Sequence, residues 1–498
     1  MIDLVHDTHP HSVFSSKQAR QLDTIAIEHQ GIKGYKLMCR AGEAAFRLIT
    51  ECYPSANRIL ILAGGGNNAG DGYVLARLLH NADFQCAVIP VIPPDRLKGD
   101  ALQAYEEYLS QGGELGKHDH QLPACDLLVD AIFGIGLDRP VKEPLSGVIN
   151  QINRHPAPVL AIDIPSGLNA DTGIPMNTAV CADTTLTFIG VKSGLLTGQA
   201  VDYAGQLFIN DLQLDDQVFN QVSPLGQTLS GSMLGEYLPP RKASAHKNSF
   251  GHVLIIGGNV GFPNAAAMAA MAAARSGAGL VSVITHPDSV CAIAASCTSL
   301  MVRGLRDPGD IGTLLKQADV IVLGPGLGKD AWARNFFARS IDLKKPMVVD
   351  ADALNLLSHN PGQKDSWVLT PHPGEAARLL DCDKNEIEIN RISSVRSLQE
   401  KYGGVVVLKG AGTLIQTPQH LSFCTYGNVS LATGGTGDVL SGIIGGLIAQ
   451  GLTPSQAASC GVIIHGQAAE NMSAHGTRGC LASDLLPEIY RLVNPCLT

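Results

Sequence analysis

Two stretches of the chain place an aspartate beside a glycine-rich loop, an arrangement that suits the binding of anionic groups. The first is Gly64–Asp71, which reads GGGNNAGD and follows the apolar run Ile59–Leu62. The second is Thr433–Asp438, which reads TGGTGD and comes directly before the apolar segment Val439–Ala449. Glycines leave backbone N–H groups bare where a helix begins, and the helix dipole adds positive potential there. Each loop is therefore a candidate binding site for a phosphoryl group or another anion.

Asp438 is placed to exchange a proton with a group bound at the second loop. It falls in the first turn of the predicted helix, where it could accept a proton from a hydroxyl that attacks a bound phosphoryl group. A helix N-terminus favours the ionised carboxylate, which suits a base at neutral pH. The alternative is an aspartate that only caps its helix. We predict that Asp438 is a catalytic residue.

In the first half, two further aspartates lie at the ends of apolar runs. Asp130 ends the run LLVD, and Asp163 lies in the segment AIDIPSG, which also contains Ser166. Ligands of open α/β sheets bind beyond the carboxyl ends of the strands. A single aspartate at a strand end is usually a loop cap, but two of them near a glycine loop favour a shared cleft. We expect Asp130 and Asp163 to face the Gly64–Asp71 loop.

Three segments of the second half resemble ligand-binding loops less specifically. Lys409–Thr413 (KGAGT) follows an apolar run and could carry a nucleotide, and Gly324–Gly328 (GPGLG) also ends a run. His372 and Glu375 lie in the proline-rich segment TPHPGE. A lone histidine is more often structural than catalytic, and Glu375 fits a charge in the first turn of a helix. These segments add support to a site at the second glycine loop without defining it.

Uniformly apolar runs, which alternate with helix-like segments, position these loops. Such runs are typical of parallel strands that are covered on both faces. In the first half they are Ile59–Leu62, Ala87–Val91, Leu127–Phe133, Val159–Ile164 and Thr185–Ile189. In the second half they are Val253–Ile256, Leu280–Ile284, Val320–Leu323, Met347–Val349, Trp367–Leu369 and Val405–Leu408. Helices are predicted at 15–29 and 36–53, and the last strong helix is predicted to start near Asp438.

We therefore predict an α/β protein with two doubly wound domains, residues 1–220 and 232–498. A length of 498 residues supports two or three domains. The stretch Asp211–Gly231 is polar and irregular, and it is expected to be the linker because no periodic apolar face is visible there.

Composition excludes several classes of protein. The formal net charge is −9 and no basic cluster is present, which argues against a nucleic-acid partner. The twelve cysteines are scattered, without C-x-x-C pairs or zinc spacing, as expected of reduced thiols in a cytoplasmic protein. The N-terminus lacks the pattern of a signal peptide. The most apolar helix candidate, Asn264–Leu280, is interrupted by Arg275 and two glycines, so no membrane span is expected.

The first-half motifs GGGNNAGDG, LVDAIFGIGL, IDIPSG and GVKSGL resemble those of the NAD(P)H-hydrate epimerases, over residues 10–210. The resemblance implies a Rossmann-like epimerase domain. It implies hydrate binding by Asn67, Asn68, Ala69, Gly70 and Asp71, and by Gly134, Ile135, Gly136, Leu137, Asp138, Arg139 and Pro140. It implies K⁺ ligation by Asn68, Asp130 and Ser166, an oxygen donor set that suits a hard cation.

The same resemblance places Asp163 at the hydrated nicotinamide ring. Epimerisation requires that a bond at the hydroxylated carbon break and re-form on the other face, so Asp163 could act as a base or stabilise a cationic ring intermediate. Lys192 is either a helper or a surface lysine. Ala69 stands where the family usually has glycine, which is tolerable unless φ is positive there.

The second-half motifs resemble those of ribokinase-like ADP/ATP-dependent NAD(P)H-hydrate dehydratases, over residues 232–490. The resemblance implies hydrate contacts from Ala265, Gly328 and His372. It implies nucleotide binding by Lys409, Gly410, Ala411, Gly412, Thr413 and Gly437, with Asp438 catalytic. ADP is the implied donor, releasing AMP and phosphate, and Mg²⁺ is expected beside the nucleotide because the transferring phosphoryl group carries charge.

Together the two halves predict a repair enzyme for damaged nicotinamide cofactors. Its small-molecule substrates would be the R and S hydrates NADHX and NADPHX, and we expect a homo-oligomer. One alternative is that the second half is a small-molecule kinase, for example of a vitamin alcohol, because GxGD alone does not separate kinase from dehydratase. In that alternative the first half is a nucleotide-binding or scaffold module.

Overall fold

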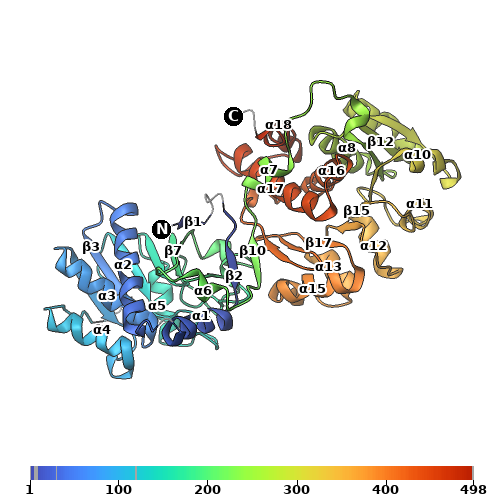
Figure 1. The fold of residues 1–498 in the computed structure, drawn as a ribbon. Coiled ribbons are helices and arrows are strands. Elements are labelled where there is room, and N and C mark those ends of the chain that lie inside the picture. The colour runs from blue at the N-terminus through green and yellow to red at the C-terminus, as the bar shows by residue number, and fades with distance from the viewer. Residues whose placement is uncertain (1, 5–8, 30, 118–120, 496–498) are drawn as a thin grey trace. The chain divides into compact units, whose positions relative to one another are not determined.

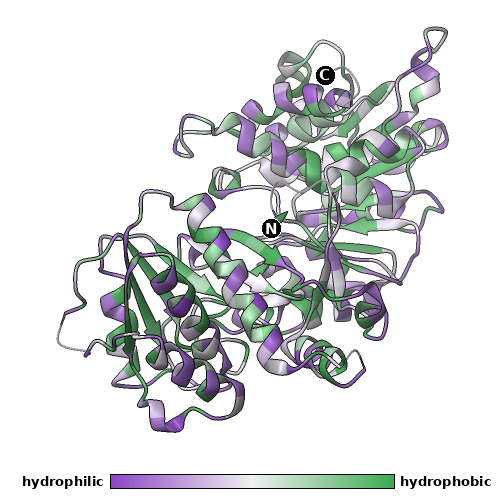
Figure 2. Ribbon diagram, turned by 60° about the vertical axis from the view of Figure 1, so that its left-hand side comes forward, coloured by the Kyte–Doolittle hydropathy of each residue, from purple (hydrophilic) through white to green (hydrophobic). Residues whose placement is uncertain are grey.

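The computed structural model describes residues 2–4, 9–29, 31–117 and 121–495, and the chain divides into two compact units, Met1–Thr228 and Leu229–Thr498. Each unit combines a largely parallel sheet with flanking helices, so the predicted α/β class is confirmed. Figure 1 colours the first unit from blue to green and the second from green to red. In both units the strands are the most hydrophobic elements, and polar residues gather on the outer faces of the helices (Figure 2).

The sheet of the first unit has the order β1-β9-β7-β6-β5-β3-β4. Its strands are β1 (Ile2–Asp3), β3 (Arg58–Ala63), β4 (Gln85–Pro90), β5 (Leu127–Ala131), β6 (Val159–Ile162), β7 (Thr184–Phe188) and β9 (Gln206–Asn210). All neighbouring strands pair in parallel, except that β1 pairs with β9 antiparallel. The five strands predicted in this half are confirmed. Strand β9 is an addition, and it lacks a continuous apolar run because its residues are buried only at alternate positions.

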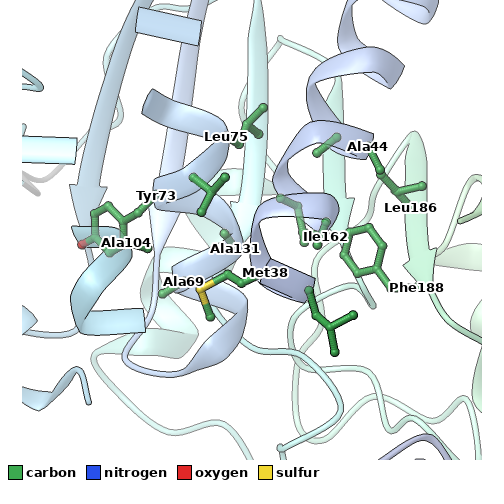
Figure 3. Close-up of a cluster of buried hydrophobic side chains, with 14 of the residues drawn as sticks. Met38, Ala44, Ala69, Tyr73, Leu75, Ala104, Ala131, Ile162, Leu186 and Phe188 are labelled. Carbon is green, nitrogen blue, oxygen red and sulfur yellow. The ribbon is translucent and has the colours of Figure 1, made fainter. Parts of the chain in front are cut away.

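Helices cover both faces of this sheet. They are α1 (Ser16–His29), α2 (Gly34–Cys52), α3 (Asn67–Asn81), α4 (Gly99–Ser110) and α5 (Leu145–Ile152). Successive residues of β3 point to opposite faces: Ile59 and Ile61 pack in the core that α2, α3 and α4 cover, whereas Leu60 and Leu62 pack in the core that α5 covers. Burial on both faces explains why the strands are apolar throughout. Figure 3 shows part of the first of these cores.

A small ladder beside the main sheet carries a candidate site residue. Lys192 lies in β8 (Val191–Lys192), which pairs in parallel with β2 (Ser12–Phe14). Strand β2 also pairs antiparallel with β10 (Gly226–Thr228). The backbone of Lys192 is therefore fixed by strand pairing rather than by a surface loop.

The prediction that Asp211–Gly231 is an irregular linker is wrong for most of its length. This stretch contains α6 (Asp216–Phe219) and β10, and its apolar side chains Leu212, Leu214, Val218 and Val222 are buried in the core of the first unit. Leu214, Val218 and Val222 are spaced at i, i+4 and i+8, but the helix within this stretch, α6, has only four residues. The apolar pattern is therefore too short for a periodicity argument to detect.

The sheet of the second unit has the order β13-β12-β11-β14-β15-β16-β17-β18-β19. Its strands are β11 (His252–Ile256), β12 (Leu280–Thr285), β13 (Met301–Gly304), β14 (Val320–Leu323), β15 (Met347–Val349), β16 (Trp367–Leu369), β17 (Val405–Leu408), β18 (Leu414–Gln416) and β19 (Leu421–Phe423). Pairing is parallel up to β17 and antiparallel from β17 to β19. The six predicted strands are confirmed, and β13, β18 and β19 are additions.

The α-helices of the second unit are α7 (Ser232–Tyr237), α8 (Pro263–Arg275), α9 (Val290–Ser296), α10 (Gly312–Gln317), α11 (Ala331–Ile341), α12 (Asp352–His359), α13 (Pro373–Leu380), α14 (Lys384–Ile389), α15 (Arg391–Tyr402), α16 (Thr436–Ala449), α17 (Pro454–Met472) and α18 (Leu485–Leu492). The prediction that the helix starting near Asp438 is the last strong helix is wrong, because α17 and α18 follow α16. Helices α8 and α16 touch closely: a Cβ added at Gly442 would lie 2.1 Å from the carbonyl oxygen of Ala269. Within the part of the chain that the structure describes, no helix has the length and apolarity that crossing a membrane requires.

Candidate active sites

The first unit contains a cavity of about 640 Å³ beyond the carboxyl ends of β3, β5 and β6. Its lining includes these residues predicted from sequence: Asn67, Asn68, Asp71, Gly134, Ile135, Gly136, Leu137, Asp163 and Lys192. Other predicted residues lie outside the lining. Ala69 is buried in the core (Figure 3), and a Cβ on Gly70 would meet Met38 at 2.5 Å. Asp138, Arg139 and Pro140 are exposed at the surface.

The glycine loop brings the start of α3 to this cavity. Gly64 allows the loop to pass against the next strand end, because a Cβ there would lie 1.9 Å from the carbonyl oxygen of Ile132. Helix α3 begins after Gly66, and no side chain caps its first turn. Its N-terminal N–H groups therefore remain available to an anionic ligand. Ala69 is helical and without positive φ, so the methyl group in place of the family's usual glycine causes no backbone strain.

An ion pair joins Asp163 to Lys192 in the cavity lining. Lys192 Nζ lies 2.6 Å from Asp163 Oδ1, and it also donates to Thr187 Oγ1 at 3.0 Å and to the carbonyl oxygen of Phe188 at 2.8 Å. The Lys192 side chain is only 3% exposed, so it is not a surface lysine. Asp163 has a φ of 68°, a left-handed backbone that a non-glycine residue adopts at a cost. The structure therefore holds this carboxylate in one orientation.

Asp130 and Ser166 form a buried, hydrogen-bonded pair, and Asn68 is buried beside Gly134, which also lies next to Asp163. Asp130 accepts hydrogen bonds from Ser166 N–H at 2.7 Å and from Ser166 Oγ at 2.6 Å. Burial raises the pKa of Asp130 to about 6, although the hydrogen bonds from Ser166 oppose the rise. Both amide atoms of Asn68 are buried, and neither has a hydrogen-bond partner within the described protein. An unmet buried amide is unfavourable, so Asn68 marks a position where a ligand is needed.

Two more carboxylates belong to this cavity, and sequence reasoning missed one of them. Asp71 has a pKa raised well above its usual value, chiefly by burial and then by the charges of Asp163 and Asp23. Asp23, on α1, has a pKa raised to about 6 by burial; Lys192 lowers it and Asp163 raises it. The spacing of Ala19, Asp23 and Ile27 in the sequence could have revealed Asp23. Residues four apart share one face of a helix, so an aspartate stands between two apolar residues on that face.

In the second unit, Asp438 lies in the first turn of α16. The residue that precedes this helix, Gly435, has a φ of 94°. Burial raises the pKa of Asp438 to about 7; Asp350 raises it further, and Lys409 lowers it. The expectation that the helix N-terminus keeps this carboxyl ionised at neutral pH is therefore wrong in degree. Desolvation outweighs the helix dipole, and the group exchanges its proton near pH 7.

Lys409 joins the glycine loop to the carboxylates around it. Its Nζ lies 2.9 Å from Asp350 Oδ1 and 3.9 Å from Glu375 Oε2. A Cβ added at Gly437 would lie 3.2 Å from this Nζ, so the TGGTGD and KGAGT loops meet here. Burial alone would lower the pKa of Lys409, but Asp350, Glu375 and Asp438 raise it above its usual value. A charged lysine thus stands beside the proposed anion hole.

Arg391 supports the KGAGT loop from behind. It is 5% exposed, and its guanidinium donates to the carbonyl oxygens of Lys409 at 3.4 Å, Leu408 at 3.3 Å and Gly412 at 3.2 Å. Gly410 has a φ of 134°, and a Cβ there would lie 2.9 Å from Arg391 Nη1. The loop is therefore fixed in shape, while Gly410 and Ala411 remain exposed to a ligand. Thr413 donates to the carbonyl oxygen of Gly410 at 3.1 Å and closes the turn.

His372 caps α13. Its Nδ1 accepts from the N–H groups of Gly374 at 3.0 Å and Glu375 at 3.4 Å, and Glu375 Oε2 accepts from His372 N–H at 2.8 Å. Burial, followed by the charge of Lys409, lowers the pKa of His372 to about 4, so its ring is neutral. Because Nδ1 accepts, Nε2 carries the hydrogen. Nε2 lies 3.4 Å from Glu375 Oε1, and the side chain is 52% exposed, so this hydrogen can also reach a ligand.

Ala265 and Gly328 lie around a second turn of glycines. A Cβ at Gly326 would lie 3.1 Å from the Ala265 side chain, and a Cβ at Gly328 would lie 2.9 Å from Asn259 Nδ2. Gly328 donates its N–H to Asp352 Oδ2 at 2.8 Å. Asp352 also raises the pKa of Asp438, so this turn lies near the same site. The structure thus gathers most of the residues predicted for the second half.

Comparison with known families assigns both units. Residues 34–194 match the family described as YjeF-related protein N-terminus, and residues 253–491 match the family described as NAD(P)H-hydrate dehydratase. A ribokinase-like superfamily protein of Enterococcus faecalis V583, whose structure is solved, has 30% identity and a TM-score of 0.51 to this chain. The alignment covers 54% of this chain and 95% of that one. The fold and these matches define a nicotinamide-hydrate repair protein with a ribokinase-like second unit.

Two relatives extend the match to nearly the whole chain. The bifunctional NAD(P)H-hydrate repair enzyme Nnr of Escherichia coli K12 is 43% identical over 492 residues, which cover 98% of this chain and 95% of that protein. The enzyme of the same name from Coxiella burnetii is 44% identical over 486 residues, covering 97% and 99%. The chain belongs to the family of bifunctional NAD(P)H-hydrate repair enzymes. It has an epimerase domain and a dehydratase domain, which confirms the principal reading of the sequence over the kinase alternative.

Proposed function

We propose that the cavity of the first unit, within the predicted domain 1–220, is where the hydrate is epimerised. The Asp163–Lys192 pair and the uncapped start of α3 support this proposal. Backbone N–H groups at Asn67 and Asn68 would bind the pyrophosphate, with Asp71 and Gly134–Leu137 beside them. Ala69 and Gly70 would contribute by forming the first turn of α3, because their N–H groups donate to the carbonyl oxygen of Gly66 at 3.1 and 3.3 Å. Asp138, Arg139 and Pro140 would contact only the outer part of the dinucleotide, because they are exposed.

The residues present fit a potassium ion. Asn68 offers a buried amide oxygen that has no partner, and Asp130 and Ser166 offer two further oxygens of the kind that K⁺ accepts. We propose that these three residues hold K⁺. The ion would supply a fixed positive charge near the bound hydrate, whereas Asp163, held in place by Lys192, faces the ring and exchanges protons with it.

In the second unit, within the predicted domain 232–498, we propose that ADP phosphorylates the ring hydroxyl. Asp438 takes the hydroxyl proton as the oxygen–phosphorus bond forms and AMP leaves. Phosphate then departs with the C–O bonding electrons, a proton leaves the neighbouring carbon, and the ring double bond is restored. The glycine N–H groups before Asp438 stabilise the transferring phosphoryl group. The convergence of Gly437, Lys409 and Asp438 is the observation that carries this proposal.

Lys409–Thr413 and Gly437 would bind the nucleotide, and Ala265, Gly328 and His372 would contact the hydrate. Mg²⁺ would neutralise charge on the phosphoryl group and would be held by phosphate oxygens and Asp352. Asp350 is buried with both carboxylate oxygens occupied and offers none to the ion. Asp350 also orients Lys409 and accepts from Ser441. The protein would act in the cytoplasm, where its cofactor substrates are held, without a nucleic-acid or membrane partner. A homo-oligomeric state is part of the proposal, and sedimentation velocity tests it.

One experiment tests both activities. A mixture of R and S NADH hydrates is incubated with the full chain, ADP, Mg²⁺ and K⁺, and NADH is followed by its absorbance. We expect complete conversion, because the first unit replenishes the S form that the second consumes. With Asp163→Asn, conversion should slow sharply once the S form is exhausted. Conversion of the S form alone by the unmodified enzyme would contradict the proposed epimerisation site, and no conversion would contradict both sites.

A further inference from the structure

Epimerisation at a hydroxylated ring carbon requires two proton transfers. The departing hydroxyl must gain a proton before it leaves as water, and the incoming water must lose one as it adds. The two events take place on opposite faces of the ring. A carboxylate positioned toward one face cannot reach the other without turning the substrate over. A site with Asp163 as its acid–base residue therefore requires a second proton-transfer group.

Helix α1 supplies a candidate from a different wall of the cavity. Ala19, Asp23 and Ile27 lie at i, i+4 and i+8, so they form one stripe, and all three line the cavity. The neighbouring residues Leu22 and Ala26 are fully buried and anchor the helix. Burying a carboxylate between two apolar residues at a cavity wall costs folding free energy. Such a cost suggests that the carboxylate serves the function of the cavity.

The charged groups around Asp23 leave it available to a ligand. The other charged residues of the cavity lining are Arg20, Asp71, Arg96, Asp100, Asp163 and Lys192. Lys192 is committed to Asp163, Thr187 and Phe188, and Arg20 donates to the carbonyl oxygen of Ile135 at 2.8 Å. Among the described residues, no hydrogen bond or ion pair to the Asp23 carboxylate is present. Asp23 is nevertheless close enough to Asp163 and Lys192 to feel their charges.

We propose that Asp23 is the second catalytic acid–base residue of the epimerase site and works with Asp163 across the ring. This inference rests on the proposed assignment of the cavity as the epimerisation site. Asp23 donates a proton to the ring hydroxyl, the C–O bond breaks with its electrons on oxygen, and water departs. The ring nitrogen lone pair forms a C=N double bond. Water then adds to the carbon from the Asp163 side, and Asp163 takes its proton.

The reverse reaction uses the same two groups with their roles exchanged, so no other reactant is needed. A pKa of about 6 leaves Asp23 able both to give and to take a proton near neutral pH, where catalytic acids and bases work best. Solvent water returns the two carboxyls to their starting protonation between turnovers.

The test is the rate at which purified R hydrate reaches epimeric equilibrium without ADP, so that the second unit is silent. Four proteins are compared: the unmodified chain, Asp23→Asn, Asp163→Asn and Glu28→Gln. Glu28 is an exposed carboxylate on the same helix and lies outside the cavity lining, so it is the matched control. We expect Asp23→Asn to lower kcat for epimerisation by about 10²-fold or more, with KM and the thermal unfolding midpoint nearly unchanged. Glu28→Gln should retain full activity.

An Asp23→Asn enzyme with kcat within about threefold of the unmodified chain would overturn the proposal. A loss of activity accompanied by a large rise in KM and a lower unfolding midpoint would also overturn it, because Asp23 would then be structural. An Asp163→Asn enzyme that still epimerises would instead show that the cavity is misassigned. That outcome concerns the proposed function and is distinct from failure of Asp23 alone.

Discussion

The ammonium group of Lys192 lies 2.6 Å from Asp163 Oδ1 and uses its remaining donors on Thr187 Oγ1 and the carbonyl oxygen of Phe188. All of these groups are buried or nearly so. The pair therefore fixes one oxygen of Asp163, while Oδ2 lies near Gly134 and accepts from the N–H of Ile135 at 3.4 Å. A carboxylate fixed in this way presents a defined oxygen to a ring in the cavity.

Removal of the lysine should destabilise the first unit as well as impair its chemistry. Lys192→Met leaves the Asp163 carboxylate buried without its partner, and breaking a buried pair in this manner costs about 3–5 kcal/mol. Urea unfolding should show this loss, whereas Lys33→Met, at an exposed lysine, should change little. Equal stability of Lys192→Met and the unmodified chain would mean that the pair does not hold Asp163 in place.

Potassium should stabilise the first unit through Asn68. We expect the thermal unfolding midpoint to be higher in KCl than in choline chloride at equal ionic strength, because a bound ion stabilises the folded state. Asn68→Leu should abolish that difference. In choline chloride the variant should be no less stable than the unmodified chain, because it removes two buried polar atoms that have no protein partner. A potassium effect that survives Asn68→Leu would place the ion elsewhere.

The pH dependence of dehydration should report Asp438. A base must be ionised, so kcat/KM for the S hydrate should fall as pH drops below about 7, the pKa of this carboxyl in the folded protein. Asp350→Asn should move this limb to lower pH, because the Asp350 charge raises that pKa. A limb that stays in place in Asp350→Asn would show that another group sets it.

Asp438 should also make the fold less stable as pH rises. Its pKa is about 7 in the folded state against 3.8 ordinarily, so the folded protein binds this proton more tightly than the unfolded chain does. Stability from this group is therefore full below pH 4 and is lost as pH rises through 7. Asp438→Asn should be more stable than the unmodified chain at pH 8, and the advantage should shrink at pH 5. Urea midpoints at the two pH values measure it.

Arg391 should matter for the nucleotide and not for the hydrate. Arg391→Met leaves the carbonyl oxygens of Lys409 and Gly412 without this donor, and the loop that carries the nucleotide loses its support. We expect KM for ADP to rise by about 10-fold with a smaller change in kcat, since one or two lost hydrogen bonds cost about 1–3 kcal/mol. Arg491→Met, at an exposed arginine of α18, is the control. An unchanged KM for ADP would contradict a positioning role.

The sequence predicted the parts of the sites that depend on local pattern. A glycine loop between an apolar run and a helix is a local signal, and so is GxGD, which is why the sequence singled out the loops that contain Asn68 and Asp438. Asp23 was not found, because its value depends on which face of α1 meets the cavity. The ion pair of Lys192 and the pKa of Asp438 likewise depend on residues far away in sequence, Asp163 for Lys192 and Asp350 for Asp438.

The most direct test of the account is the fate of the phosphoryl group at the loop before Asp438. Purified S NADH hydrate and ADP are mixed with the full chain, and NADH, AMP and inorganic phosphate are measured together. We predict equal amounts of all three, with Asp438→Asn lowering the rate by about 10²-fold or more. Accumulation of a phosphorylated hydrate without NADH or inorganic phosphate, or formation of NADH without consumption of ADP, would contradict it.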